Sequence, residues 1–205
     1  SISILSGPSF SNEVSQSLPT AVTLATKDKK DFDNISKLIP NKEFRIYYSN
    51  DLIGTQIGGA LKNIYAIAAG VAEGLNLGEN AKSALISRSF AEMTRYAKKF
   101  KADKNTLFGL SGLGDLILTC SSKNSRNTQF GIKLASSKYD NFLDLLKSQE
   151  VTEGYYTVKA VYNISQKKNI DMPIMESVYN ILYKQHDLKE ELSNLLSRPI
   201  TEEKI

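Results

Sequence analysis

The chain has 205 residues, 41% hydrophobic and 23% charged, so it can bury a sizeable core and is not a disordered segment. Its net charge of +4 is spread in short lysine pairs, which favours solvated surface over a nucleic-acid patch. One cysteine, Cys120, and one histidine, His186, exclude an internal disulfide, a histidine-based catalytic pair and a Cys/His zinc cage. We therefore expect a reducing, cytoplasmic compartment, one or two domains, and no metal.

Residues 1–49 predict the end of an α/β unit that is too small to be complete. Runs rich in isoleucine, valine, threonine and aromatic residues indicate strands at Ile2–Leu5, Thr20–Thr26 and Phe44–Tyr48. A short helix is expected from Ser11 and an amphipathic one over Asp31–Leu38. The chain does not begin with methionine, so we expect its true N-terminus to lie upstream, and a signal peptide cannot be judged.

Residues 50–205 predict helices throughout. The expected long helices are Leu52–Ala72, Asn80–Phe100, Thr152–Gln166, Pro173–Tyr183 and Leu188–Leu196. Two shorter helices are expected to start at Asp115 and Ser125, after a tight loop that holds Gly109, Gly112 and Gly114. The predicted fold class is therefore mainly α: an all-helical domain preceded by a small β-α-β unit.

Lys62 is the only charge in the run Leu52–Ala72. A lysine near the centre of a membrane span costs roughly 2.5 to 3.5 kcal/mol, so we interpret the run as a buried helix of a soluble domain, without membrane insertion. One face of this helix is small and polar and carries Gly58, Gly59, Lys62, Asn63 and Ala66. Another face is apolar and carries Ile53, Ile57, Leu61, Ile64, Ala68 and Val71. Lys62 is the best candidate for an acid–base group; the alternative is that its long side chain reaches the surface from an apolar helix.

Asp115 is the natural partner for that lysine, although a carboxylate at a helix start is as often an ordinary cap. Thr119 lies one turn further on and can offer a hydroxyl, or can satisfy its own backbone instead. The surrounding GLSGLGD segment is not a dinucleotide-binding fingerprint, because no convincing strand leads into it and no βαβ unit follows.

Two segments could bind an anion. Ser125, Arg126 and Asn127 combine a hydroxyl, a guanidinium and an amide where a helix is expected to begin, which suits a phosphate. Taken alone, helix capping plus a surface arginine is the better explanation of this triplet. Gly7 and Ser9, with the amides that follow them, form a second and weaker candidate.

Four segments, in order, resemble one family. They are SGPSF, IGGALKNIYAIAAGVAEGLNLGENAKSALISR, GLSGLGDLILTCSS followed by SRN, and VTEG. Over the range from Ser3 to Ser197 the chain resembles the bacterial NAD(P)-dependent glycerol-3-phosphate dehydrogenases. The resemblance implies hydride transfer between NAD or NADP and dihydroxyacetone phosphate, which gives sn-glycerol 3-phosphate for phospholipid synthesis.

The resemblance also assigns roles to catalytic and substrate-binding residues. Lys62 matches the catalytic lysine, Asn63 and Asp115 match polar partners of that lysine and of the substrate, and Thr119 matches the threonine one turn on. The glycerol phosphate would be held by Ser125, Arg126 and Asn127, and Gly7 and Ser9 match the substrate loop.

Cofactor contacts are implied for Ser11, Arg126, Val151 and Glu153. In the family the glycine-rich turn lies upstream of SGPSF. Residues 1–49 are therefore expected to be the end of an incomplete N-terminal dinucleotide-binding domain, and residues 50–205 to be the helical substrate-binding and catalytic domain. By itself the chain is expected to bind NAD(P)H poorly and to lack activity.

Two other functions stay open. The helices could form a non-catalytic dimerisation module or a remnant, or the chain could serve a different dehydrogenase with the same general plan. The choice between NAD and NADP depends on a residue in the expected upstream half. A homodimer is possible, and feedback regulation cannot be judged.

Overall fold

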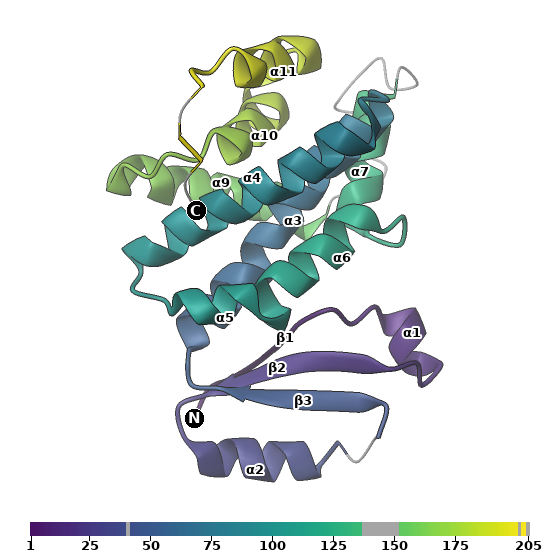
Figure 1. The fold of residues 1–205 in the computed structure, drawn as a ribbon, viewed down its shortest axis with the longest axis vertical. Helices are drawn as coiled ribbons and strands as arrows, with labels where there is room; N and C mark the ends of the chain where they lie inside the picture. Colours follow the sequence, from purple (N-terminus) through teal and green to yellow (C-terminus); the bar gives the residue numbers. More distant parts are fainter. Residues whose placement is uncertain (40–41, 137–151, 201, 204–205) are drawn as a thin grey trace.

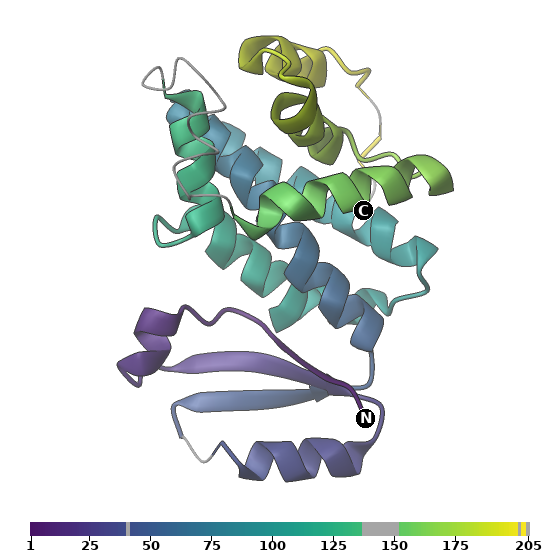
Figure 2. The ribbon, with the colours of Figure 1, turned by 180° about the vertical axis from the view of Figure 1, so that it is seen from behind.

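The fold was analysed in a computed structural model, which describes residues 1–39, 42–136, 152–200 and 202–203. It has a small α/β layer at one end and a larger helical domain at the other (Figures 1 and 2). This arrangement confirms the predicted fold class. None of the described helices is both long and apolar enough to cross a membrane.

The α/β layer is a three-stranded sheet in the order β1-β2-β3. Strand β1 (Ser3–Ser6) runs antiparallel to β2 (Thr20–Thr26), and β2 runs parallel to β3 (Phe44–Ser49). Helix α1 (Ser11–Ser15) connects β1 to β2, and α2 (Lys29–Lys37) lies between β2 and β3 in the sequence, which makes the β-α-β unit. Strand β2 is nearly all buried because it lies between two neighbours, whereas β1 and β3 are largely half-buried or exposed.

The helical domain is built around α3 (Leu52–Gly74), which passes through its middle in Figure 1. Its other elements are α4 (Gly78–Lys99), α5 (Lys104–Phe108), the π-helical turn η1 (Leu110–Gly114), α6 (Asp115–Ser121), α7 (Arg126–Ala135), α9 (Glu153–Lys168), α10 (Pro173–Lys184) and α11 (Leu188–Leu196). The long helices end close to where their periodicity predicts. Helix α5 was not expected, and the loop predicted around Gly112 is the turn η1.

Helix α3 is buried around most of its circumference, so the expected division into an apolar and a small polar face is only partly correct. Gly58 and Ala66, placed on the polar face, are buried, whereas Ile53 on the apolar face is 45% exposed. Glycines allow very close contacts of α3, such as the one with α7: a Cβ on Gly70 would lie 2.1 Å from the carbonyl oxygen of Thr128. Lys62 therefore extends from a helix that other helices of the domain surround on most sides.

Candidate active site

Lys62 and Asp115 meet between α3 and α6. The Lys62 Nζ donates to Asp115 Oδ2 at 2.6 Å, and the two side chains are 21% and 2% exposed. Helix α3 begins where the Asp51 side chain accepts from the backbone N–H of Gly54 at 2.9 Å, as a capping aspartate should. Asp115 is not an N-cap: it is the first residue of α6, directly after η1, and its carboxylate faces the lysine. The predicted partnership is present in the structure.

Thr119 holds this carboxylate from the other side. Its hydroxyl lies 2.6 Å from the backbone oxygen of Asp115 and 3.2 Å from Oδ1 of the same residue. Both roles expected for Thr119 are therefore present in part. Its hydroxyl contacts the backbone carbonyl oxygen one turn earlier, and it also contacts the Asp115 carboxylate. Thr119 is buried, and it contributes to the site by orienting Asp115.

Asn127 connects three helices next to Lys62. Its Nδ2 donates to Asn63 Oδ1 on α3 at 3.1 Å, and its Oδ1 accepts from the Gly154 N–H in the first turn of α9 at 3.0 Å. Asn127 is 4% exposed, so these bonds lie inside the protein. They orient Asn63, which follows Lys62 in the chain.

Ser125 and Arg126 begin α7 in the way that helix capping predicts. The Ser125 hydroxyl accepts from the backbone N–H of Thr128 at 3.2 Å, and Ser125 is 3% exposed. Arg126 is exposed and pairs with the Glu153 carboxylate at the start of α9. The Arg126 guanidinium therefore lies at the surface, near the first residues of α7 and α9, and forms an ion pair with the Glu153 carboxylate.

The loop after β1 completes the site. Gly7 has φ +145°, a conformation that side chains rarely adopt, and a Cβ there would lie 3.0 Å from the Val22 Cα. The Ser9 hydroxyl donates to the carbonyl oxygen of Gly7 at 2.9 Å, which folds the loop back on itself. Ser11, the first residue of α1, is exposed.

A cleft of about 620 Å³ joins these parts. Six predicted residues line it, namely Gly7, Ser9, Lys62, Asn63, Asp115 and Glu153. Five others do not line it: Ser11, Thr119, Ser125, Arg126 and Asn127. Val151 lies outside the described residues. The geometry thus gathers the acid–base pair and the substrate loop around one space and leaves the SRN triplet beside it.

Sequence reasoning missed half of the cleft wall. The further lining residues are Ile4, Leu5, Ser6, Thr55, Gln56, Gly59 and Ala60. Gly59 had been placed on the same face as Lys62 and Asn63 but not assigned to the site, and the spacing of Gln56 and Ala60 from Asn63 follows the helical period and could have added them. Strand residues such as Ser6 carried no such signal, because only tertiary packing brings β1 against α3.

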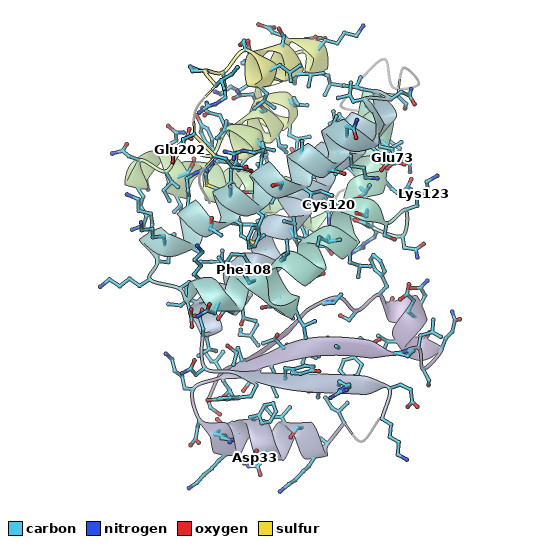
Figure 3. All side chains as sticks on the ribbon, viewed as in Figure 1. Asp33, Glu73, Phe108, Cys120, Lys123 and Glu202 are labelled. Carbon is cyan, nitrogen blue, oxygen red and sulfur yellow. The ribbon has the colours of Figure 1, made fainter. Side chains whose placement is uncertain are left out.

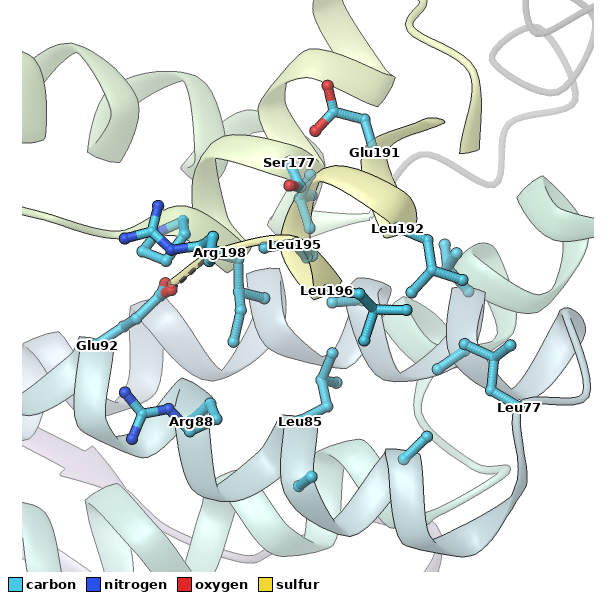
Figure 4. A pocket seen from close by; sticks show the side chains of 18 of the residues that line it. Leu77, Leu85, Arg88, Glu92, Ser177, Glu191, Leu192, Leu195, Leu196 and Arg198 are labelled. Atoms are coloured by element: carbon cyan, nitrogen blue, oxygen red, sulfur yellow. Dashed lines mark hydrogen bonds between the residues drawn. The ribbon is translucent and has the colours of Figure 1, made fainter. Parts of the chain in front are cut away.

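A larger cavity of about 830 Å³ lies away from Lys62, between α3, α4, α10, α11 and the segment after α11. Figure 4 shows Leu85, Leu192, Leu195 and Leu196 around it, with Arg88, Glu92 and Arg198 at one end. None of the predicted site residues lines this cavity. Its size alone does not make it the reaction site, since it lacks the acid–base pair.

Two buried titratable groups belong to the packing. Burial raises the pKa of Glu92 to about 7, partly countered by the backbone N–H groups of Ile174 and Met175, which the carboxylate accepts at 2.6 and 3.1 Å. Burial also raises the pKa of the Cys120 thiol to about 12, and that residue lies inside the helical domain in Figure 3. In the described ranges no three His, Cys, Asp or Glu side chains gather as a metal site.

Comparisons with known proteins place the chain in a family. Residues 51–193 match the family described as "NAD-dependent glycerol-3-phosphate dehydrogenase C-terminus", and the chain belongs to it. The glycerol-3-phosphate dehydrogenase (NAD(P)+) of Solidesulfovibrio magneticus is 47% identical over 98% of this chain and 60% of its own length. That of Colwellia psychrerythraea is 44% identical over 97% and 59%.

The fold agrees with this assignment. A crystal structure of glycerol-3-phosphate dehydrogenase from Coxiella burnetii matches with a TM-score of 0.90 and 38% identity over 96% of this chain and 60% of that one. The enzyme from Plasmodium falciparum matches with a TM-score of 0.86 at 28% identity. The chain spans about 60% of the length of the curated relatives it matches.

Proposed function

We propose that this chain carries the substrate-binding and acid–base part of an NAD(P)-dependent glycerol-3-phosphate dehydrogenase. The reaction is the reversible reduction of dihydroxyacetone phosphate to sn-glycerol 3-phosphate in the cytoplasm, for phospholipid synthesis. The Lys62–Asp115 pair in the cleft is the observation that carries the proposal. In this assignment residues 1–49 belong to the cofactor domain and residues 50–205 form the substrate domain.

Lys62 is suited to move the proton of this reaction. An ammonium group has three donors, and Asp115 takes one, so others can reach a carbonyl oxygen in the cleft. When that oxygen gains negative charge in reduction, Lys62 gives it a proton; in oxidation the neutral amine takes the proton back. Asp115 fixes the position of the ammonium group, and Thr119 fixes Asp115.

The phosphate of the substrate is assigned to the anion-binding segments. Arg126 can bind a phosphate through two parallel hydrogen bonds once it leaves Glu153, and its exposure allows that exchange. Gly7 and Ser9 would hold the substrate from the β1 side of the cleft, which Asn63 also lines. The side chains of Ser125 and Asn127 already have hydrogen-bond partners within the protein, which lets them support this pocket. Direct contacts of both residues with the phosphate are also part of the proposal.

The same cleft is the proposed place of the nicotinamide ring. Gly59 lets the Ser6 side chain of β1 approach the α3 wall closely, since a Cβ on Gly59 would lie 3.0 Å from the Ser6 Oγ. The chemistry that a bound NAD or NADP supplies is the hydride. Ser11, Arg126, Val151 and Glu153 are the proposed cofactor contacts of this chain. A homodimer is also part of the proposal, and sedimentation equilibrium measures it directly.

The test requires an upstream cofactor domain, so the chain is joined behind the corresponding part of the Solidesulfovibrio magneticus enzyme. NADH oxidation with dihydroxyacetone phosphate is expected for the fusion, and Lys62→Ala should lower kcat by about 10² to 10⁴. Lys82→Ala is the matched control, because Lys82 forms a similar 2.7 Å ion pair with Glu73 away from the cleft. A loss below about tenfold for Lys62→Ala would remove the lysine from the acid–base role.

A further inference from the structure

The closest backbone contact near Lys62 occurs at Gly58. A Cβ built on Gly58 would lie 2.1 Å from the carbonyl oxygen of Ser111, 2.9 Å from its carbonyl carbon and 3.1 Å from the Gly112 Cα. Real Cβ contacts are essentially never shorter than 3.0 Å. Glycine is a poor helix former compared with alanine, so its presence inside a long helix needs a packing or functional reason. Here the reason is that α3 and η1 touch through their backbones.

This contact joins the two segments that carry the acid–base pair, about one turn before each member. Gly58 is one helical turn before Lys62, and Ser111 lies in the turn η1 that runs directly into Asp115 at the start of α6. Both connections are short and helical, and rigid helices transmit a displacement at one position to the next turn. The separation of α3 from η1 at Gly58 therefore sets the separation of the Lys62 Nζ from the Asp115 carboxylate, now 2.6 Å.

The turn η1 is also in close contact with α5, the helix that precedes it in the chain. A Cβ on Gly112 would lie 2.0 Å from the carbonyl oxygen of Leu107 on α5, so η1 contacts α5 as closely as it contacts α3. π-helical turns inside helical segments are frequent at functional sites. Because η1 contacts both α3 and α5 this closely and continues directly into α6, a new side chain at Gly58 would displace the start of α6.

We propose that Gly58 is a positioning residue for the acid–base pair: the absence of a side chain there places η1, and with it Asp115, within hydrogen-bond reach of Lys62. This inference rests on the proposed function of Lys62. In Gly58→Ala, the Ser111 carbonyl must move by about 1 Å to relieve the contact. A shift of that size weakens a 2.6 Å hydrogen bond sharply, and misplacement by about 1 Å can cost about 10² in rate.

The first measurement uses the 205-residue chain and needs no activity. Side-chain nitrogen NMR of the lysine ammonium groups detects those that a hydrogen bond protects from exchange. We expect a protected Lys62 signal in the wild type, its loss in Asp115→Asn, and its loss in Gly58→Ala. The matched control is Gly74→Ala, which places a Cβ 2.7 Å from the Ala135 Cβ at the far end of α3 and should keep the signal.

The second measurement is kinetic and uses the fusion described above. Gly58→Ala should lower kcat by about 10² while the KM for dihydroxyacetone phosphate changes less than about threefold, since the phosphate contacts lie elsewhere. Adding Asp115→Glu to Gly58→Ala should restore part of kcat, because the longer side chain can span the displacement. A purely structural role for Gly58 would not produce this rescue.

The two measurements separate the inference from the function. If the fusion is inactive but Gly58→Ala still removes the Lys62 ammonium signal, the proposed function is overturned and the positioning role is supported. An unchanged signal and an unchanged kcat in Gly58→Ala overturn the positioning role. If the variant is unfolded in buffer, the spectra are recorded in trimethylamine N-oxide, which favours compact states. Failure to fold even there would overturn the proposal, since the contact would then serve the fold rather than the pair.

Discussion

Glu92 predicts an unusual dependence of stability on pH. This carboxyl group on α4 is 1% exposed and accepts from two backbone N–H groups at the start of α10. Burial raises its pKa from an ordinary value of 4.5 to about 7. Between those two values the folded protein holds a proton on Glu92 that the unfolded chain has released. The free energy of unfolding therefore falls as the pH rises through this window and becomes level above it.

The magnitude follows from the two pKa values. At about 1.4 kcal/mol for each tenfold change in an equilibrium constant, the difference corresponds to about 3 kcal/mol. That is a large fraction of the 5 to 15 kcal/mol that typically stabilises a domain. The measurement is urea unfolding of the chain at several pH values across the window, for the wild type and for Glu92→Gln.

The difference between the two proteins isolates this group from others that titrate. Glu92→Gln cannot release a proton, so its stability should lack the decline, although its amide leaves one N–H without an acceptor at a cost of about 1 to 3 kcal/mol. Glu73→Gln is the control, since Glu73 pairs with Lys82 nearer the surface and should leave the decline in place. Parallel curves for the wild type and Glu92→Gln would refute the reasoning.

Further substitutions test the site and the packing around it. In the fusion enzyme, Asp115→Asn should lower kcat at least tenfold because the ammonium loses its charged partner, which steady-state kinetics will show. Asn127→Ala should destabilise the chain by about 1 to 3 kcal/mol in urea unfolding, since two buried hydrogen bonds disappear. Phe130→Ala should cost about 3 to 5 kcal/mol and lower the Tm in calorimetry, because this side chain is 1% exposed in the core. Cys120 should react with a thiol reagent only after unfolding, since burial raises its pKa to about 12; rapid labelling of the native chain would contradict its burial.

Much of the local structure followed from patterns within one or two helical turns. The period of apolar residues predicted the long helices, and α3 begins at an aspartate, Asp51, whose side chain caps it. Ser125 caps α7 in the same way. The β-branched runs predicted three strands, with β1 displaced by one residue from the expected Ile2–Leu5. These features depend on neighbours in the chain, so a single sequence contains most of the information they need.

The faces of α3 were harder to predict for a physical reason. A helix with one exposed side shows its orientation in its pattern, whereas α3 is covered by several neighbours and is apolar nearly all round. Gly58 and Gly70 serve contacts with the backbones of η1 and α7. The positions of η1 and α7 depend on the packing of the whole domain. The sequence therefore shows glycines inside a helix but not which backbone they contact.

What the sequence determined by itself was the inventory of the site: a lone lysine in an apolar helix, an aspartate at a helix start, a serine–arginine–asparagine triplet, and a glycine–serine loop. Tertiary structure decided which of these meet. It brought Lys62 to Asp115, paired Arg126 with Glu153, and gave the polar groups of Asn127 internal partners. The reason is that each contact joins elements distant in the chain, and their spacing is set by close packing, as at Gly58, rather than by local propensity.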